Sequence, residues 1–347
     1  MVYILDFSSL PILWSTLAIL AAVILVSATQ LAKSADIIAF KTGLGRSFIG
    51  VVLLATATSL PELGTGITSV TMIGGSEGAD LAAGDAFGSN LFNLLIIGIL
   101  DIIWRRGPIL SSLGTGVPLV GVLAVAGIVI AAGGIIIHQN ISFASNWFVS
   151  PVSIVLVLVF AAALYAVYKE EKHSDHSETE HNYEESSLTR AFVVYGIAAA
   201  IVVVAAIFLA NTGEGLAEAM GWERSFVGTQ FLALSTSLPE LAASIAALRI
   251  MAPELAITNL LGSNLFNMGF VLFLDDVSYT SGPIWNAISP IHALTAIIAV
   301  LMTMVVLVPS VSRAKLSFGR LVTFESVSLI SLYIIASVLV FLAGGGH

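Results

Sequence analysis

The sequence contains no cysteine, which excludes disulfide bonds, thiolate metal sites and a cysteine nucleophile. It is also poor in charge: Asp, Glu, Lys and Arg make up 10% of the 347 residues, whereas about 25% is usual in soluble domains. Only 13 residues are Lys or Arg, against 22 Asp or Glu, and the formal net charge is −9. Such a chain offers no basic surface for nucleic acid.

Hydrophobic residues take the place of the missing charge, at 57% of the chain with a mean hydropathy of +1.00. This composition indicates an integral membrane protein in a lipid bilayer. At about 20 apolar residues per span, the sequence predicts an all-α protein with ten transmembrane helices. They lie near residues 11–32, 47–72, 80–101, 115–137, 148–168, 191–212, 225–249, 254–274, 288–308 and 321–343. The first is expected to be a retained span, because it is too long for a signal peptide and lacks a basic leader.

A polar tract at residues 169–190 divides the chain into two halves, residues 1–168 and 191–347. It contains His173, His176 and His181 among acidic and serine residues. We expect a solvated linker. The alternative, a metal-sensing histidine loop, is not favoured, because the spacing fits no metal-ligand pattern.

The basic residues predict the orientation in the membrane. With both termini outside, the inner connections hold every Lys and Arg except Arg224. The outer connections are expected to carry Glu77, Asp275 and Asp276, which contribute little to orientation but could attract cations. Five spans per half is an odd number, so the second half enters the membrane from the opposite side and the halves are inverted repeats. The short loops and the absence of targeting signals suggest a prokaryotic plasma membrane.

The stretch 54–63 reads Leu-Ala-Thr-Ala-Thr-Ser-Leu-Pro-Glu-Leu, which places Pro61 and Glu62 inside an apolar span. An acid there is costly and indicates a functional site. Proline removes a backbone hydrogen bond, so the helix must loosen, as in the broken helices that line ion sites. Thr58 and Ser59 lie one helical turn before the acid, on the same face.

This stretch occurs twice. Residues 42–70 align without gaps on 220–248, and the hexapeptide 58–63 recurs as 236–241. A second pair, Gly-Ser-Asn-Leu-Phe-Asn, begins at Gly88 and at Gly262, with a connector four residues shorter in the second half. Inverted repeats with broken helices near the midplane are typical of secondary transporters.

Three residues before each Gly-Ser-Asn segment lies another polar residue, Asp85 in the first half and Asn259 in the second. The predicted centre therefore offers carboxylate, amide and hydroxyl oxygens, which suit Ca²⁺ better than Mg²⁺. Transition metals are disfavoured, since the spans hold only His138 and His292, both near span ends, where interfacial hydrogen bonding is expected. The predicted ligands are Glu62, Glu240, Asp85, Asn259, Thr58, Ser59, Thr236 and Ser237. Packing and supporting roles are expected for Ser89, Asn90, Asn93, Ser263, Asn264 and Asn267.

The paired Thr-Ser-Leu-Pro-Glu and Gly-Ser-Asn-Leu-Phe-Asn segments resemble the two alpha repeats of the cation/calcium antiporters, especially sodium/calcium exchangers. The resemblance implies a ten-helix exchanger with four short core helices around the ions. It implies that the carbonyls of Ala55 and Ala233 are ligands too. It also implies that the first and sixth helices form a block that slides across the core.

The chain departs from the family pattern in several places. Ala57 and Ser235 stand where the family often has glycine before Thr-Ser, and Thr258 precedes Asn259 where glycine is usual. Sodium-coupled members would be expected to have a serine hydroxyl in the turn before Asp85 or Asn259. The residues there are Leu81, Ala82, Leu255 and Ala256. These departures leave the fold intact but weaken the case for sodium coupling.

The predicted function is antiport of Ca²⁺ against Na⁺ by alternating access, with H⁺ as the alternative counter-ion. A centre with three acids should change its access from one side of the membrane to the other only when bound cations or protons neutralise the acids. Neither a prosthetic group nor an obligatory protein partner is expected. A channel would need rings of ligands along a pathway, which the sequence lacks. An intramembrane aspartyl protease lacks its Gly-x-Gly-Asp signature, because residue 82 is alanine, and a serine protease lacks a mid-span histidine base. The protein is therefore not expected to be an enzyme.

Overall fold

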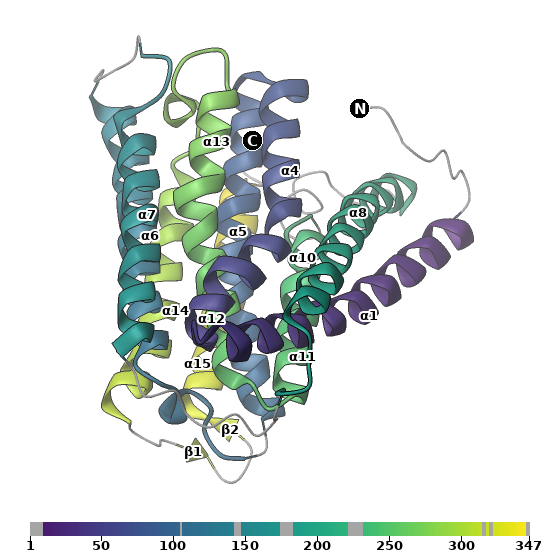
Figure 1. The fold of residues 1–347 in the computed structure, drawn as a ribbon. Coiled ribbons are helices and arrows are strands. Elements are labelled where there is room, and N and C mark those ends of the chain that lie inside the picture. Colours follow the sequence, from purple (N-terminus) through teal and green to yellow (C-terminus); the bar gives the residue numbers. More distant parts are fainter. Residues whose placement is uncertain are drawn as a thin grey trace.

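The computed structural model describes residues 10–104, 106–141, 147–173, 183–220, 232–313, 317–318 and 322–344. These residues form a helical bundle (Figure 1). The first half contains α1 (Leu10–Thr42), α2 (Arg46–Ile49), the π-helical segment η1 (Gly50–Ala55), α3 (Thr56–Thr58), α4 (Leu60–Thr68), the π-helical segment η2 (Ser69–Ile73), α5 (Gly75–Ile103), the short turn η3 (Leu110–Ser112), α6 (Gly116–Asn140) and α7 (Pro151–His173).

The second half follows the same order. It contains α8 (Leu188–Met220), α10 (Leu232–Thr236), α11 (Leu238–Arg249), α12 (Pro253–Phe266), the π-helical segment η5 (Asn267–Val271), α13 (Leu272–Ser278), the short turn η6 (Ile284–Asn286), α14 (Ile291–Ser312), β1 (Ser317–Phe318), β2 (Val322–Thr323) and α15 (Phe324–Gly344). The strands β1 and β2 pair antiparallel just before α15.

The structure bears out the ten-helix fold. Within the described residues, eight helical segments are long and apolar enough to cross a membrane, and the bent run 46–73 makes a ninth. The helices α10 and α11 occupy the corresponding place in the second half, although residues 225–231 of that predicted span lie outside the described residues. The polar tract 169–190 holds the end of α7 and the start of α8, and its central histidines, His176 and His181, also lie outside the described residues.

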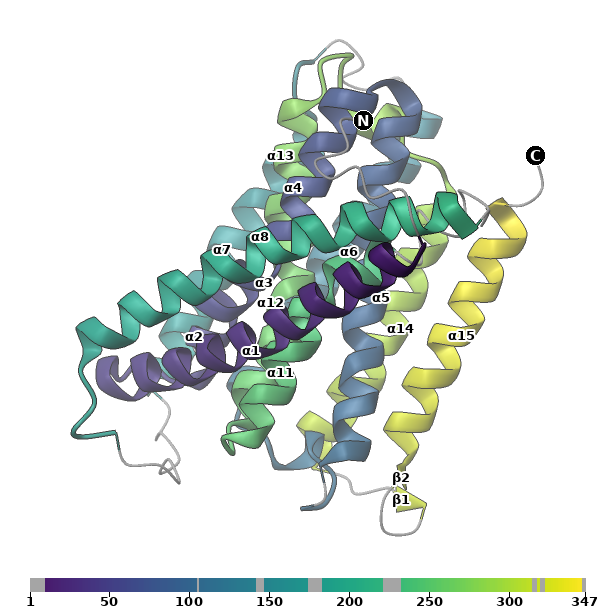
Figure 2. The ribbon, with the colours of Figure 1, turned by 90° about the vertical axis from the view of Figure 1, so that its right-hand side faces the viewer.

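The helices α1 and α8 differ most from the predicted spans. Each is 33 residues long, or about 50 Å at the usual rise, whereas the hydrocarbon core is about 30 Å thick. They therefore have to cross at a steep tilt. Figures 1 and 2 show the two lying side by side and sloping across the other helices. This is the pair that the family resemblance expects to form a separate block.

An ion pair attaches the end of α1 to the rest of the molecule. The Arg46 guanidinium lies 2.7 Å from the Asp36 carboxylate, which is fully buried. The Tyr183 hydroxyl donates to the same carboxylate at 3.0 Å, next to the start of α8. Here the linker region, α1 and α2 meet at one face of the bundle.

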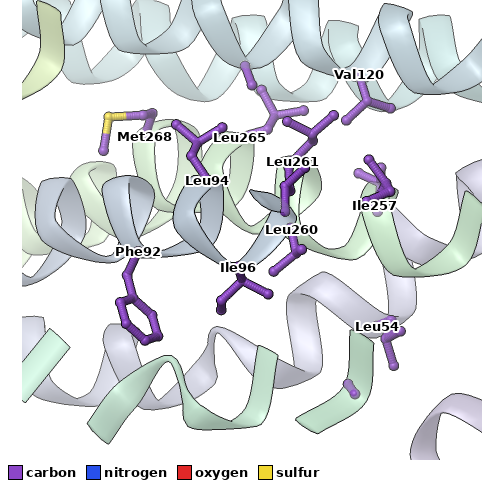
Figure 3. Packing of buried hydrophobic residues seen from close by; sticks show 14 of the residues in the cluster. Leu54, Phe92, Leu94, Ile96, Val120, Ile257, Leu260, Leu261, Leu265 and Met268 are labelled. Carbon is purple, nitrogen blue, oxygen red and sulfur yellow. The ribbon is translucent and has the colours of Figure 1, made fainter. Parts of the chain in front are cut away.

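Small residues allow the two halves to approach closely at the centre. A Cβ placed on Gly262 of α12 would lie only 2.9 Å from the Val51 Cα in η1, so only glycine fits this crossing. Around it, apolar side chains of α5, α6 and α12, among them Leu94, Val120 and Leu261, fill the space between the helices (Figure 3). This packed core fixes the position of the broken helices that carry the motifs.

The prediction that Asp275 and Asp276 lie in an outer connection is wrong. Both belong to α13 and are fully buried. The helix continues through them because Asp276 finds hydrogen-bond donors inside the protein: its carboxylate accepts the N–H groups of Ser150 and Ile284, each at 2.7 Å, and the Ser153 hydroxyl at 2.6 Å. A hydropathy window counts such acids as polar and ends the span before them.

Candidate functional site

The helix breaks at the same residue of each repeat, the serine of Thr-Ser-Leu-Pro-Glu. Ser59 has φ −91° and ψ 6°, and Ser237 has φ −86° and ψ 6°, both outside the helical region. Pro61 and Pro239 then lie in the first turn of the new helices α4 and α11, where a missing N–H is tolerated. The run 46–73 bends by 41° at this point. The predicted loosening at the proline therefore takes the form of a sharp break two residues earlier.

The break also sets the hydrogen bonds of the preceding turn. The Thr58 hydroxyl donates back to the carbonyls of Leu54, at 3.0 Å, and Ala55, at 3.4 Å. The Ala55 carbonyl also accepts the Ser59 N–H at 2.9 Å. Ala55 thus lies on the last turn before the break, where its carbonyl accepts a helical hydrogen bond, and Ala233 lies in α10 at the equivalent position.

The two glutamates bind hydroxyls from the opposite repeat. The Ser59 hydroxyl donates to Glu240 at 3.0 Å, and the Ser237 hydroxyl donates to Glu62 at 3.3 Å. Ser263 of α12 also donates to Glu240, at 3.3 Å. The repeats therefore meet around an internal twofold relation, with each carboxylate held by the other half.

The threonines cross over in the same way. Thr236 donates to the Asp85 carboxylate at 3.1 Å, and the Thr58 hydroxyl lies 3.3 Å from the amide oxygen of Asn259. The eight residues that the sequence singles out are thus brought together at the centre of the bundle, and their exposures range from 0% to 3%.

Two more hydroxyls, which the sequence analysis did not single out, complete this arrangement. The Thr65 hydroxyl donates to Asp85, and the Ser244 hydroxyl accepts the Asn259 amide N–H at 3.0 Å. Each follows its glutamate by about one turn on the same helix face, three residues on in the first repeat and four in the second. That spacing was available in the sequence as a signal.

The carboxylates of Glu62 and Glu240 are incompletely bonded. The Oε2 atom of each is buried and has no hydrogen-bond partner. A buried carboxylate oxygen without a donor is costly unless a cation approaches it. Within the described residues, no three carboxylate or imidazole groups converge as a closed metal site. The centre instead combines the carboxylates of Glu62 and Glu240 with hydroxyl, amide and carbonyl oxygens. Hard cations prefer this set of donors.

The asparagines of the Gly-Ser-Asn segments form a network between the repeats. Asn93 donates to the Asn264 side chain at 3.0 Å, Asn264 donates to the Asn90 carbonyl at 3.2 Å, and Asn267 donates to the Asn90 side chain at 3.4 Å. The Ser89 hydroxyl is buried without a hydrogen-bond partner. For the asparagines, the predicted packing role agrees with these contacts.

The two span histidines lie away from the centre and are hydrogen-bonded. His138 contacts the Asn286 side chain and the Ser150 hydroxyl, each at 2.8 Å. His292 lies 2.9 Å from the Asp80 carboxylate. Both thus have the hydrogen-bonding role expected from their positions near span ends.

Comparison with known proteins gives a consistent result. A family model described as sodium/calcium exchanger protein matches residues 12–169 and 190–342. The chain is 31% identical over 268 residues to the inner membrane protein YrbG of Escherichia coli (strain K12), covering 76% of this chain and 79% of that protein. A stretch of 83 residues, 24% of either chain, is 31% identical to the sodium/calcium exchanger MaX1 of Methanosarcina acetivorans. The fold is similar to that of the sodium-calcium exchanger NCX_Mj, with a TM-score of 0.73 over 94% of this chain and 98% of that chain at 20% identity.

Proposed function

Because the chain belongs to the sodium/calcium exchanger family, and is therefore a membrane antiporter rather than an enzyme, we propose that it exchanges Ca²⁺ against Na⁺ by alternating access. The observation that carries this proposal is the pair of buried, unpartnered carboxylate oxygens, Oε2 of Glu62 and Oε2 of Glu240. They come from the two inverted repeats and lie among hydroxyl oxygens, so one cation between them would satisfy both.

In this proposal the substrate Ca²⁺ binds directly to Glu62 and Glu240. The hydroxyls of Thr58, Thr236, Ser59 and Ser237 and the carbonyls of Ala55 and Ala233 complete the oxygen donors around the transported ions. Asp85 and Asn259 lie on either side, each within reach of a threonine of the opposite repeat. Their different charges make the two sides of the site unequal.

The charge of the centre favours exchange over leak. Three buried acids cannot be enclosed in a low dielectric without cations or protons to balance them. The central site would therefore switch from one side of the membrane to the other only with a cation or proton bound. This requirement, in both directions, is the condition for counter-transport. The tilted pair α1 and α8 is the element proposed to slide across the core and change the accessible face.

H⁺ is the alternative counter-ion, and one observation favours it. The turn before Asp85 and the turn before Asn259 present Ala82, Leu255 and Ala256 as buried apolar side chains. Two positions where separate sodium ions would need oxygen ligands thus lack them. Asp85 is then the natural proton carrier, because both glutamates are proposed to contact Ca²⁺ directly.

The test is calcium efflux from loaded proteoliposomes. External Na⁺ should drive efflux with the pH clamped and a protonophore present. Efflux that follows a pH gradient and does not respond to Na⁺ would show that H⁺ is the counter-ion. In that case Asp85→Asn should abolish the pH dependence. Calcium movement without any opposing gradient, at a rate set by the membrane potential alone, would contradict both.

A further inference from the structure

Asp275 of α13 is a buried acid that the proposed central site does not use. Its exposure is 0%, and neither of its carboxylate oxygens has a hydrogen-bond partner. The side chain points at Gly66 of α4: a Cβ placed on Gly66 would lie 2.5 Å from Oδ1 and 2.7 Å from Oδ2. The absence of a side chain at Gly66 makes the room that this carboxylate occupies.

Comparison of the two repeats shows that Asp275 does not hold neighbouring segments by hydrogen bonds, as the adjacent Asp276 does. Asp101, at the end of α5, accepts the Ile109 N–H at 2.9 Å and the hydroxyls of Thr323 and Ser326. Asp276 accepts an N–H eight residues ahead in the same way, together with a serine hydroxyl at the start of α7. Asp276 is therefore the counterpart of Asp101.

The aligned sequences, however, pair Asp101 with Asp275, counting from the Gly-Ser-Asn segments. The π-helical segment η5, which interrupts the helix between α12 and α13, accounts for the difference of one residue. The first repeat has an uninterrupted α5 over the same stretch. The extra residue moves Asp276 into the supporting position and leaves Asp275 turned toward the interior.

Asp275 is close to the central acids. Asp85, one of the three central acids, is near enough to Asp275 for their charges to repel. Gly66, which it faces, follows Glu62 by four residues on α4, which is about 6 Å along the same helix face. Thr65 of that turn is bonded to Asp85. Glu62, Asp85 and Asp275 thus form a row of buried acids beside α4.

This row of acids extends from the central site toward one face of the bundle. It is the face at which α4 and α13 end (Figure 1). In the second repeat Ser244 stands where Gly66 stands in the first, and its hydroxyl is bonded to Asn259. The row of acids is therefore present on one side of the centre only.

We propose that Asp275 is the carboxylate of a separate outer subsite that holds a hard cation, Ca²⁺ or Na⁺, between the central site and the face where α13 ends. A cation there would satisfy the two unpartnered oxygens and offset the repulsion from Asp85. This inference rests on the proposed antiport function, since it concerns the route by which the transported ion reaches Glu62.

The first test measures calcium binding to the purified full-length protein by equilibrium dialysis. Glu240→Gln, which disables the central site, should retain one weaker class of bound Ca²⁺, and Asp275→Asn in that background should remove it. A repeat with Na⁺ as competitor tells whether both cations use the subsite. Complete loss of binding in Glu240→Gln alone would overturn the subsite and leave the antiport proposal intact. Absence of binding and of transport in the unmodified protein would instead overturn the antiport proposal.

The second test measures transport from each face in oriented vesicles. When Ca²⁺ is supplied from the face where α13 ends, Asp275→Asn should raise the half-saturating Ca²⁺ concentration about tenfold, as expected for loss of one charged contact. When Ca²⁺ is supplied from the face that carries the linker 169–190, the half-saturating concentration should not change. Gly66→Ala should have the same effect, because its methyl group displaces the carboxylate without removing the charge. Gly64→Ala is the matched control, since a Cβ there meets nothing within 4 Å. An equal change on both faces, or none on either, would contradict the subsite.

Discussion

Glu62 and Glu240 differ from the other buried acids in what their oxygens contact. In each, one carboxylate oxygen accepts a serine hydroxyl of the opposite repeat and the other has no partner. The glutamates are held in position but not saturated. Such an arrangement is suited to a ligand that arrives and leaves.

Replacing either glutamate should therefore remove function without unfolding the protein. We expect Glu62→Gln or Glu240→Gln to abolish calcium transport in proteoliposomes, because the amide is a weak cation ligand. The midpoint of thermal unfolding should stay the same or rise, because the change relieves repulsion between buried acids. Glu77→Gln, at an exposed position, is the control and should transport normally. Full transport by a folded glutamate variant would refute the central site.

The acids at the ends of α5 and α13 should behave in the opposite way. Asp101→Asn and Asp276→Asn each weaken hydrogen bonds to a buried carboxylate, which is worth about 1–3 kcal/mol per lost charged contact. The midpoint of thermal unfolding in detergent should fall for both variants. Asp275→Asn, which loses no hydrogen bond, should not lower it. A fall for Asp275→Asn as large as that for Asp276→Asn would mean that Asp275 is a structural residue.

At the scale of the helix, the break at Ser59 and Ser237 determines which groups reach the centre. Pro61→Ala returns an N–H to the chain and lets the helix run straight through the break. We expect calcium transport to fall strongly in Pro61→Ala and in Pro239→Ala, with thermal stability equal or greater. Pro309→Ala, inside α14 and away from the centre, is the control for removing a proline. Normal transport by either motif variant would show that the break does not depend on proline.

Much of this element structure could be predicted from the sequence, because the information is local. The duplicated motif indicated the break, the repeat relation and the eight polar residues that the structure brings together. Their role as ligands stays a prediction, as do the half boundaries at 168 and 191. The burial of Asp275 could not be predicted, because its orientation depends on the one extra residue that the π-helical segment η5 accommodates. Such an insertion does not change the hydropathy profile. The lengths of α1 and α8 were also missed, since hydropathy ends at polar residues such as Asp36, which is buried by pairing with Arg46.

For the molecule as a whole, the distribution of Lys and Arg predicts both termini outside. Because the chain has no cysteine, a single introduced cysteine reports one position cleanly. In intact cells, a cysteine in place of Ser281, after α13, should react with an impermeant thiol reagent, whereas one in place of Glu185, before α8, should be protected. Both should react after the membrane is permeabilised. The reverse pattern would invert the orientation and place Asp275 toward the inner face.

The length of the sloping pair α1 and α8 makes the lipid bilayer itself part of the transport machinery. Two helices of 33 residues can stay within a thin hydrocarbon layer only by leaning, and a thicker layer lets them stand more upright. If this pair moves across the core to change access, its two end positions fit different membrane thicknesses. Acyl-chain length would then favour one access state over the other and tune the exchange rate without touching an ion ligand.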